Sequence, residues 1–353
     1  MRHGSEINPP NRFERVHVED DFEHLDGDAE SVDELARAAR TVEYLADDTR
    51  SIVTTNDSPD IPFRHSLNPY RGCLHGCSYC YARPTHEYLG LSAGLDFETK
   101  IVVKLRAAEL FRRFLARPNW TAEHIVMSGV TDCYQPAERG FRVSRGCVEV
   151  ASQTGQPLGI ITKNALVTRD LDLLAGMARR RLARVYISVT TLDEALAREM
   201  EPRTSSPLAR LRAVGQLAAA GVPVGVMVAP VIPGLNDHEI PAILKAAAEA
   251  GARMAGYVML RLPTTVGPVF FEWLERTRPD LRAKIESRVR SVRGGKLNES
   301  DFGRRMRGEG PVAEQIRQLF KLCAARHALD QELPAYDREQ FRPPSESGQL
   351  RLF

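Results

Sequence analysis

The sequence predicts an α/β protein whose centre is an open, partial (β/α)6 TIM-like barrel. Between Ser66 and Leu260, short β-branched runs alternate with helical stretches, and a repeated order of strand then helix is typical of a parallel sheet. Six strand candidates are fewer than the eight strands of a closed barrel, so the barrel should be open. In such folds the functional site lies at the carboxyl ends of the strands.

The strand candidates are runs rich in β-branched residues, bounded by turn formers. They are Thr99–Val103, His124–Met127, Leu158–Thr162, Arg184–Val189, Pro223–Val228 and Met254–Leu260. One connecting helix has clear end signals. Ser206 is expected to cap its first turn, Pro207 suits its first position, and Gly221 should end it. Beyond Thr264 the pattern becomes helical.

We expect four parts along the chain. They are an acidic, partly disordered N-terminal extension (1–60), the barrel (61–265), a basic helical C-terminal region (266–342) and a flexible tail (343–353). The first 50 residues hold 14 acidic and 6 basic side chains, and a helix-like patch runs from Val32 to Leu45.

Composition excludes several classes of protein. The chain has 353 residues, 43% of them hydrophobic, and its 48 basic and 46 acidic side chains nearly balance, so it is not disordered throughout. Six cysteines are too few for a disulfide scaffold, and no apolar leader follows Met1, so we expect a cytoplasmic protein with thiols or metal ligands. The longest apolar stretch, Val222 to Leu235, is too short and too rich in proline and glycine to span a membrane.

Three cysteines lie within eight residues, as Cys73, Cys77 and Cys80, with the spacing C-x3-C-x2-C. Soft thiolates this close in sequence are expected at one metal centre. Zinc normally takes four protein ligands, and only His75 or His86 could be the fourth, whereas an iron–sulfur cube can leave one iron for a non-protein ligand. The spacing favours an open-site cluster, and a zinc knuckle or structural cluster is the alternative.

This loop, with an aromatic residue before its last cysteine and a partial barrel after it, resembles the radical S-adenosylmethionine (SAM) superfamily. It is most similar to spore photoproduct lyase-like members, over about residues 60 to 270. The matching segments are SLNPYRGCLHGCSYCYARPTHEY (66–88), VTDCYQPAE (130–138), ITKN (161–164) and VMVAPVIPGLND (226–237). The resemblance implies that the three cysteines hold a 4Fe-4S cluster and that SAM chelates its fourth iron. It also implies reductive cleavage of SAM to a 5′-deoxyadenosyl radical, which takes a hydrogen atom from the substrate, and an external electron donor such as flavodoxin or ferredoxin.

The resemblance also implies residues that bind SAM. Thr131 and Asp132, at the end of the second strand, match the place where the superfamily contacts the SAM amino group. Ser188 and Arg203 are candidates for the ribose and the carboxylate, since a guanidinium suits a carboxylate. Tyr79, the aromatic residue before the last cysteine, is also predicted to contact the cofactor. The alternatives are a helix N-cap for Asp132 and a surface ion pair for Arg203.

This sequence departs from the lyase pattern at the residue that returns a hydrogen atom to the product radical. The lyase carries a cysteine just before the threonine/serine-Asp segment, whereas residues 128–130 here read Ser-Gly-Val. Cys133 and Tyr134 could form a relay on the far side of Asp132, and a buried structural thiol is the alternative. Repair of the thymine photodimer therefore does not follow. The remaining cysteines, Cys147 and Cys323, lie in predicted helices without ligand spacing and are expected in the core.

Two further features concern partners. Residues 274–308 hold 11 basic and 5 acidic side chains, and a run of this kind is usually a solvated helix face. Together with the resemblance, it suggests a phosphate-binding surface beside the barrel. Gln349–Phe353, at the end of the tail, resembles the short peptide that docks bacterial DNA repair and replication proteins onto the sliding clamp. It could instead fold back onto its own domain.

We therefore predict a radical SAM enzyme that acts on a nucleic acid, in DNA repair or nucleotide modification. One alternative is a non-catalytic, metal-stabilised module that binds nucleic acid. The other is a radical SAM enzyme whose substrate is a protein or a small molecule.

Overall fold

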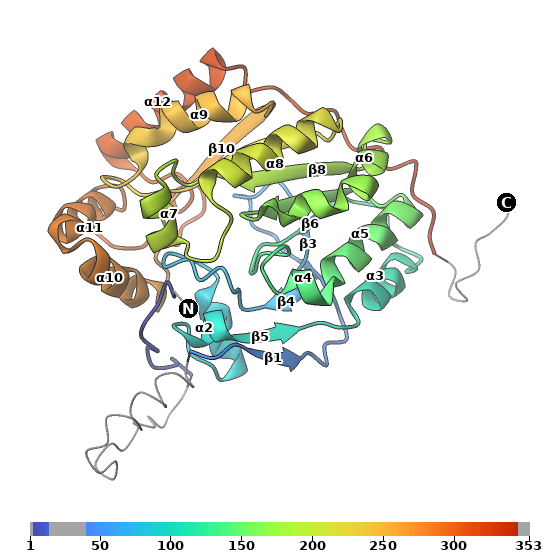
Figure 1. The fold of residues 1–353 in the computed structure, drawn as a ribbon, viewed down its shortest axis with the longest axis horizontal. Coiled ribbons are helices and arrows are strands. Elements are labelled where there is room, and N and C mark those ends of the chain that lie inside the picture. Colours follow the sequence, from blue (N-terminus) through green and yellow to red (C-terminus); the bar gives the residue numbers. More distant parts are fainter. Residues whose placement is uncertain (1–2, 14–39, 345–353) are drawn as a thin grey trace, which may run out of the picture.

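The computed structural model describes residues 3–13 and 40–344. Within these residues, the larger sheet has six parallel strands in the order β3-β6-β7-β8-β9-β10, and β2 pairs antiparallel with β3 (Figure 1). These strands are β2 (Val53–Thr55), β3 (His65–Leu67), β6 (Ile125–Met127), β7 (Leu158–Thr162), β8 (Ala183–Ser188), β9 (Val224–Val231) and β10 (Met254–Met259). The prediction of an α/β fold built on an open, six-stranded partial barrel is confirmed.

Helices lie between the parallel strands and after the last of them, β10 (Figure 1). They are α2 (Asp96–Thr99), α3 (Ala107–Leu115), α4 (Glu138–Phe141), α5 (Val143–Thr154), α6 (Leu171–Arg179), α7 (Glu194–Met200), α8 (Pro207–Ala219), α9 (Ile240–Glu249), α10 (Val266–Thr277), α11 (Arg282–Ser291) and α12 (Gly310–Arg326). Short 3-10 helices occur at η2 (Arg83–Thr85), η3 (Glu87–Leu89), η4 (Ala165–Asp170), η5 (Asp237–Glu239) and η6 (Pro279–Leu281). Helix α8 begins as predicted, because the Ser206 hydroxyl accepts the backbone N–H of Ala209 at 3.3 Å. Gly221 follows its end with a φ of +77°.

One predicted strand belongs to a different sheet. The segment predicted as Thr99–Val103 forms β5 (Lys100–Val103), which lies between β1 (Glu43–Ala46) and β4 (Tyr70–Arg71) in a separate three-stranded sheet. The first barrel strand is β3 instead. Its three residues are too few for a two-residue periodicity to show in the sequence.

The N-terminal part packs on the barrel more than the sequence predicts. The helix-like patch from Val32 to Leu45 lies mostly outside the described residues, and its last residues belong to strand β1. Residues 3–13 lie against the cysteine loop and α2, where the backbone N–H of Ser5 donates to the Glu98 carboxylate at 2.8 Å. These described residues are thus part of the folded body and contact the predicted site.

Two apolar clusters hold the molecule together. The main core fills the space between the sheet and its helices, and the strands supply it with buried apolar residues such as Ile160, Val185, Ile187 and Val226. A second cluster joins the cysteine loop to α10 and α11. Its members include Cys77, Tyr79, Ile232, Leu260, Phe270, Trp273, Ile285 and Val289. The helical C-terminal region therefore packs against the side of the barrel where the cysteines lie.

The C-terminal peptide and the prediction that no segment spans a membrane remain to be compared with the structure. The peptide Gln349–Phe353 lies outside the described residues. Within the part of the chain that the structure describes, no helix has both the length and the apolar character needed to cross a membrane.

Candidate functional site

The cysteine loop follows strand β4, and close packing determines its path. Gly72 and Gly76 have φ values of +75° and +64°, a region that favours glycine. A Cβ on Gly72 would lie 2.7 Å from the His86 ring, and a Cβ on Gly76 would lie 2.4 Å from the Glu98 carboxylate. Both glycines of the loop are therefore needed for a bend that brings the cysteines against α2.

The three cysteines of this loop lie close together. Cys77 packs in the second apolar cluster, Cys73 packs with Phe97, and Cys80 contacts both groups. Burial raises the pKa of Cys77 well above its ordinary value, and Glu201, followed by Cys80 and Cys73, adds to the rise. Burial and Cys73 likewise raise the pKa of Cys80 to about 11. Burial therefore disfavours the thiolate forms of Cys77 and Cys80, and a positively charged group bound to them would favour those forms.

The donor set fits the predicted 4Fe-4S cluster. Such a cluster can take three cysteine ligands and leave one iron for a non-protein ligand, and this loop offers three cysteines that form no disulfide. His75, a candidate fourth ligand for zinc, has both ring nitrogens engaged, since Nδ1 lies 3.4 Å from the Asp132 carboxylate and Nε2 lies 3.1 Å from the Asn164 amide.

Asp132 lies where the second barrel strand meets the cysteine loop. Its carboxylate accepts the Thr162 hydroxyl and the backbone N–H of Lys163, each at 2.7 Å, at the carboxyl end of β7. It also accepts the backbone N–H of Tyr134 at 2.8 Å. Burial alone would raise the pKa of Asp132, but His75 and these hydrogen bonds outweigh burial and lower it. A charged Asp132 thus links the β6 end, the β7 end and the loop.

Thr131 is placed beside the loop backbone. Its hydroxyl donates to the Gly72 carbonyl at 2.6 Å, and the Gln135 side chain accepts the backbone N–H of Leu74 at 2.8 Å. Gln135 also donates to the Gly72 carbonyl at 3.1 Å. The sequence analysis missed Gln135, although it lies inside the segment 130–138 that carries the resemblance.

A buried ionic network surrounds Tyr79. The Tyr79 hydroxyl donates to the carboxylate of Glu201, which also accepts Thr190 at 2.7 Å and pairs with Arg210. Lys163 places its ammonium 4.0 Å from Glu201 and donates to the Ala229 carbonyl of β9 at 2.9 Å. Burial alone would raise the pKa of Glu201, but Arg210 and Lys163 chiefly lower it to about 2.

Four basic residues of this region, His86, Lys100, Lys104 and Lys163, differ in their surroundings. The imidazole of His86 bonds the Lys100 carbonyl at 2.9 Å, and the Lys100 ammonium pairs with Asp96 at 3.2 Å. Lys104 is buried, and burial lowers its pKa to about 8. Of these four, Lys163 is the residue that follows directly on a barrel strand, β7.

The Arg203 guanidinium bonds a buried carboxylate through Nη2. Arg203 lies beside Gly76 and pairs with the buried Glu98 at 3.0 Å, while its backbone N–H bonds the His75 carbonyl. Arg83 pairs with the same carboxylate at 2.5 Å. Ser188 ends strand β8 and is buried, as expected for a residue at the barrel mouth. The structure thus brings Arg203 to the loop, where it has a structural partner that the sequence did not reveal.

Cys133 and Tyr134 lie in the main core. Both are fully buried, and the Tyr134 hydroxyl donates to Asp170 at 2.9 Å. Burial raises the pKa of both groups well above their ordinary values. This placement supports the structural alternative for Cys133. Cys147 and Cys323 are also buried in the main core, as predicted.

Tyr81 and Arg261 lie together beside the cysteine loop. Tyr81 follows the last cysteine of the loop directly, keeps 49% of its surface exposed and donates its hydroxyl to the Gly129 carbonyl. The Arg261 guanidinium lies 5.5 Å from the centre of the Tyr81 ring. The sequence analysis missed this pair because Arg261 is 180 residues away from the loop in sequence.

Comparisons with known proteins agree with this geometry. Residues 67–247 match the family model of the radical SAM superfamily. An uncharacterized protein of Mycobacterium tuberculosis is 39% identical over 232 residues, which cover 65% of this chain and 68% of that protein. An uncharacterized protein of Methanocaldococcus jannaschii is 28% identical over 176 residues, 50% of this chain and 63% of that protein.

Solved structures of spore photoproduct lyase share the fold. One mutant of that enzyme superposes with a TM-score of 0.61 and 19% identity, covering 84% of this chain and 83% of the lyase. Another, with bound AdoMet and a dinucleoside spore photoproduct, gives a TM-score of 0.59, 19% identity, and 83% and 82% coverage. The family match and the strand order lead to the same assignment: this chain belongs to the radical SAM superfamily and is a radical SAM enzyme.

Proposed function

We propose that this enzyme uses a 4Fe-4S cluster held by Cys73, Cys77 and Cys80 to act on a nucleic acid. The observation that carries the proposal is the position of these three thiols, on one tight loop beside the carboxyl ends of six parallel strands. With SAM bound, such a cluster supplies an electron that breaks SAM into methionine and a 5′-deoxyadenosyl radical. The protein's part is to hold, orient and shield these groups.

Three residues, Gln135, Thr131 and Asp132, would position the cofactors by holding the cysteine loop. Gln135 and Thr131 hold the loop backbone at Gly72, and Asp132 holds His75 in the middle of the loop. Asp132 is close to the loop, as a residue that orients the SAM amino group must be. Its carboxylate already bonds Tyr134, Thr162, Lys163 and His75, so Asp132 also keeps the loop in place.

We infer that Lys163 binds the SAM carboxylate in place of Arg203. The Arg203 guanidinium already bonds the Glu98 carboxylate. Lys163 has three donors: one bonds the Ala229 carbonyl at 2.9 Å, and the ammonium lies 4.0 Å from the Glu201 carboxylate, which Arg210 already pairs. Its ammonium lies 5.8 Å from the centre of the Tyr79 ring, so it is close to the loop.

The nucleic-acid substrate is supported by two observations. Spore photoproduct lyase, whose fold this chain shares, has been solved with a dinucleoside lesion. In addition, Tyr81 and Arg261 offer an exposed aromatic ring and a cation beside the loop, a combination that suits a base and a phosphate. Photodimer repair itself is not proposed, because residues 128–130 carry no hydrogen-donating cysteine.

Anaerobic reconstitution tests the cofactor part of the proposal. The wild-type protein should take up about four irons per chain and form 5′-deoxyadenosine from SAM under reduction. Replacement of Cys73, Cys77 or Cys80 by Ala should abolish the visible absorbance of the cluster and SAM cleavage together. Cys147→Ala and Cys323→Ala are matched controls, and equal loss of iron in a folded control variant would contradict the assignment.

The substrate needs a separate test. Crosslinking of the reconstituted enzyme in cell extract, followed by identification of the bound material, should recover DNA or RNA. Recovery of a protein or a small metabolite that changes in mass after turnover would instead support the alternative substrate classes. Metal binding without formation of 5′-deoxyadenosine would overturn the proposed catalytic chemistry.

A further inference from the structure

The basic region of the C-terminal part is mostly neutralised by the chain's own carboxylates. Six of its arginines form ion pairs. The pairs are Arg276 with Glu272, Arg278 with Glu199, Arg282 with Glu275 and Glu286, Arg290 with Glu286, Arg304 with Asp301 and Glu309, and Arg305 with Asp60. Arg293 and Arg307 donate to backbone carbonyls. The region is therefore not one continuous phosphate-binding surface, contrary to the simplest interpretation of its charge.

Two cations on α11 are exceptions. Lys284 and Arg288 are exposed, and among residues 3–13 and 40–344 neither has a carboxylate partner. They are four residues apart and so lie on the same face of the helix. A different face carries Ile285 and Val289, which are buried in the apolar cluster of Cys77. Helix α11 therefore packs with one face toward the cysteine loop and leaves two cations unpaired on another.

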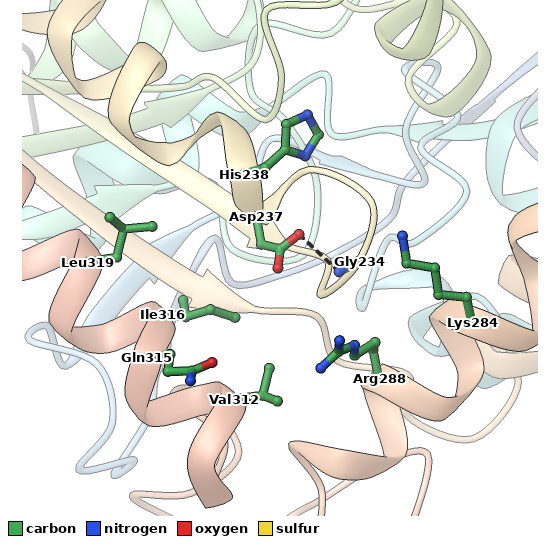
Figure 2. Close-up of a pocket in the computed structure, with 9 residues that line it drawn as sticks. All are labelled: Gly234, Asp237, His238, Lys284, Arg288, Val312, Gln315, Ile316 and Leu319. Atoms are coloured by element: carbon green, nitrogen blue, oxygen red, sulfur yellow. Dashed lines mark hydrogen bonds between the residues drawn. The ribbon is translucent and has the colours of Figure 1, made fainter.

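These two cations line a cavity of about 470 Å³ between α11, α12 and the loop that follows β9 (Figure 2). Figure 2 shows Lys284 and Arg288 on one side and the α12 side chains Val312 and Ile316 on the other. We call this cavity the α11 pocket. Its cationic wall and apolar wall together suit a nucleotide unit, which has a phosphate and a flat, largely apolar base.

The loop that follows β9 forms the third wall of the α11 pocket, and it carries an acidic residue, Asp237. Asp237 accepts the backbone N–H of Gly234 at 2.9 Å, so part of its hydrogen-bonding capacity is used within the loop. Gly234 has a φ of +86°, and a Cβ there would lie 3.3 Å from Arg288. The glycine thus lets this loop lie close to α11. Because the loop starts at the carboxyl end of β9, the α11 pocket lies on the same side of the barrel as the cysteine loop.

We propose that the α11 pocket binds a phosphate group of the nucleic-acid strand whose reacting nucleotide enters the barrel mouth. This inference rests on the proposed function and adds a second contact to it, away from the reacting atoms. Lys284 and Arg288 supply the charge, and the α12 wall contacts the adjoining sugar or base. A phosphate contact of this kind positions the strand without reading its sequence.

Charge removal at the α11 pocket tests the proposal. The Lys284→Gln/Arg288→Gln variant should bind a fluorescein-labelled single-stranded 12-mer, as DNA and as RNA, about tenfold more weakly at low salt. Its plot of log affinity against log salt should be shallower by about 1 to 2, since contacts to phosphate release counterions. The matched control is Arg112→Gln/Arg212→Gln on α3 and α8. It removes the same net charge and leaves no carboxylate without its partner. This control should change affinity less than about threefold, and thermal unfolding should confirm that both variants fold.

The outcomes separate the two proposals. If the wild type binds either oligonucleotide and the α11 variant binds it equally well with the same salt dependence, the pocket proposal is wrong and the proposed function stands. If the wild type binds neither at low salt, the nucleic-acid substrate and the pocket proposal are both wrong. If the two double variants lose affinity equally, overall charge explains binding and the pocket proposal is wrong. If the variant loses only its binding of a poly-glutamate peptide, the pocket is a protein-binding site.

Discussion

At the scale of single residues, Asp132 joins three parts of the site through one carboxylate. It bonds the end of β7, the turn after β6 and His75 of the cysteine loop. Thr131, Gln135 and Asn164 also bond the loop from the segments that follow β6 and β7. The charge on Asp132 therefore affects the geometry of the loop as well as any direct contact with SAM.

We predict that Asp132→Asn weakens SAM binding about tenfold and leaves the iron content unchanged. Asn keeps the shape but loses the charge that strengthens these hydrogen bonds, and bonds to charged groups are worth about 1.5 to 3 kcal/mol. Titration calorimetry of the anaerobically reconstituted enzyme with SAM measures the change. Asp172→Asn, which alters an exposed carboxylate paired with Arg145, is the control. Unchanged SAM affinity in Asp132→Asn would remove Asp132 from the site.

The lowered pKa of Glu201 predicts that its contribution to the free energy of unfolding is lost in acid. Its folded pKa of about 2 lies below the ordinary value of 4.5. The stabilisation is therefore fully present above pH 4.5 and is lost as the pH falls toward 2. We predict that Glu201→Gln lowers the free energy of unfolding at pH 7 by about 3 to 5 kcal/mol, because Arg210 loses its buried partner. The difference from the wild type should shrink below pH 4.5. Urea unfolding from pH 7 to pH 3 measures it, and a constant difference would contradict this assignment.

At the scale of elements, residues 3–13 form one wall of the cysteine loop. The backbone N–H groups of Gly4 and Ser5 donate to Glu98 at 3.1 and 2.8 Å, and the same carboxylate pairs with Arg83 and Arg203. Burial alone would raise the pKa of Glu98, but Arg83, with help from Arg203, lowers it. One buried carboxylate thus connects the N-terminal segment, α2 and the segment after α7.

We predict that Gly4→Ala destabilises the cysteine loop. A Cβ on Gly4 would lie 1.7 Å from the Gly76 carbonyl oxygen, so the backbone of one segment must move. The free energy of unfolding should fall by about 1 to 3 kcal/mol, and the reconstituted cluster should lose iron faster in air. Gly140→Ala in α4, where a Cβ would have nothing within 4 Å, is the control. Equal iron loss in the two variants would show that residues 3–13 do not support the loop.

At the scale of the whole molecule, the two ends of the barrel differ in what they carry. The cysteine loop, Lys163 and the α11 pocket lie on the side of the strands' carboxyl ends. The last described residues lie on the other side, where the backbone N–H of Arg342 bonds the Thr154 carbonyl at the end of α5 (Figure 1). Residue 344, the last that the structure describes, follows a segment on the side away from the barrel mouth.

We predict that a peptide of residues 343–353 binds the sliding clamp of the source organism in titration calorimetry. Leu352 and Phe353 would fill the apolar groove of the clamp, and each large apolar side chain is worth about 1.5 to 3 kcal/mol when buried. The Leu352→Ala, Phe353→Ala peptide should not bind. In the full chain, bound clamp should leave SAM cleavage unchanged. If the peptide fails to bind and removal of residues 349–353 lowers the melting temperature, the tail packs on its own protein instead.

Local patterns in the sequence were enough to determine the class of fold and the likeness of the cysteine loop to its family. The strand over Leu158–Thr162, the helix from Pro207 and the C-x3-C-x2-C spacing each depend on neighbours within a few residues. Only the tertiary structure decided that β5 leaves the barrel for a second sheet and that Arg203 pairs with Glu98. The physical reason is that Arg203 and Glu98 are about a hundred residues apart in sequence, and the local periodicity of a sequence carries no information about such distant partners.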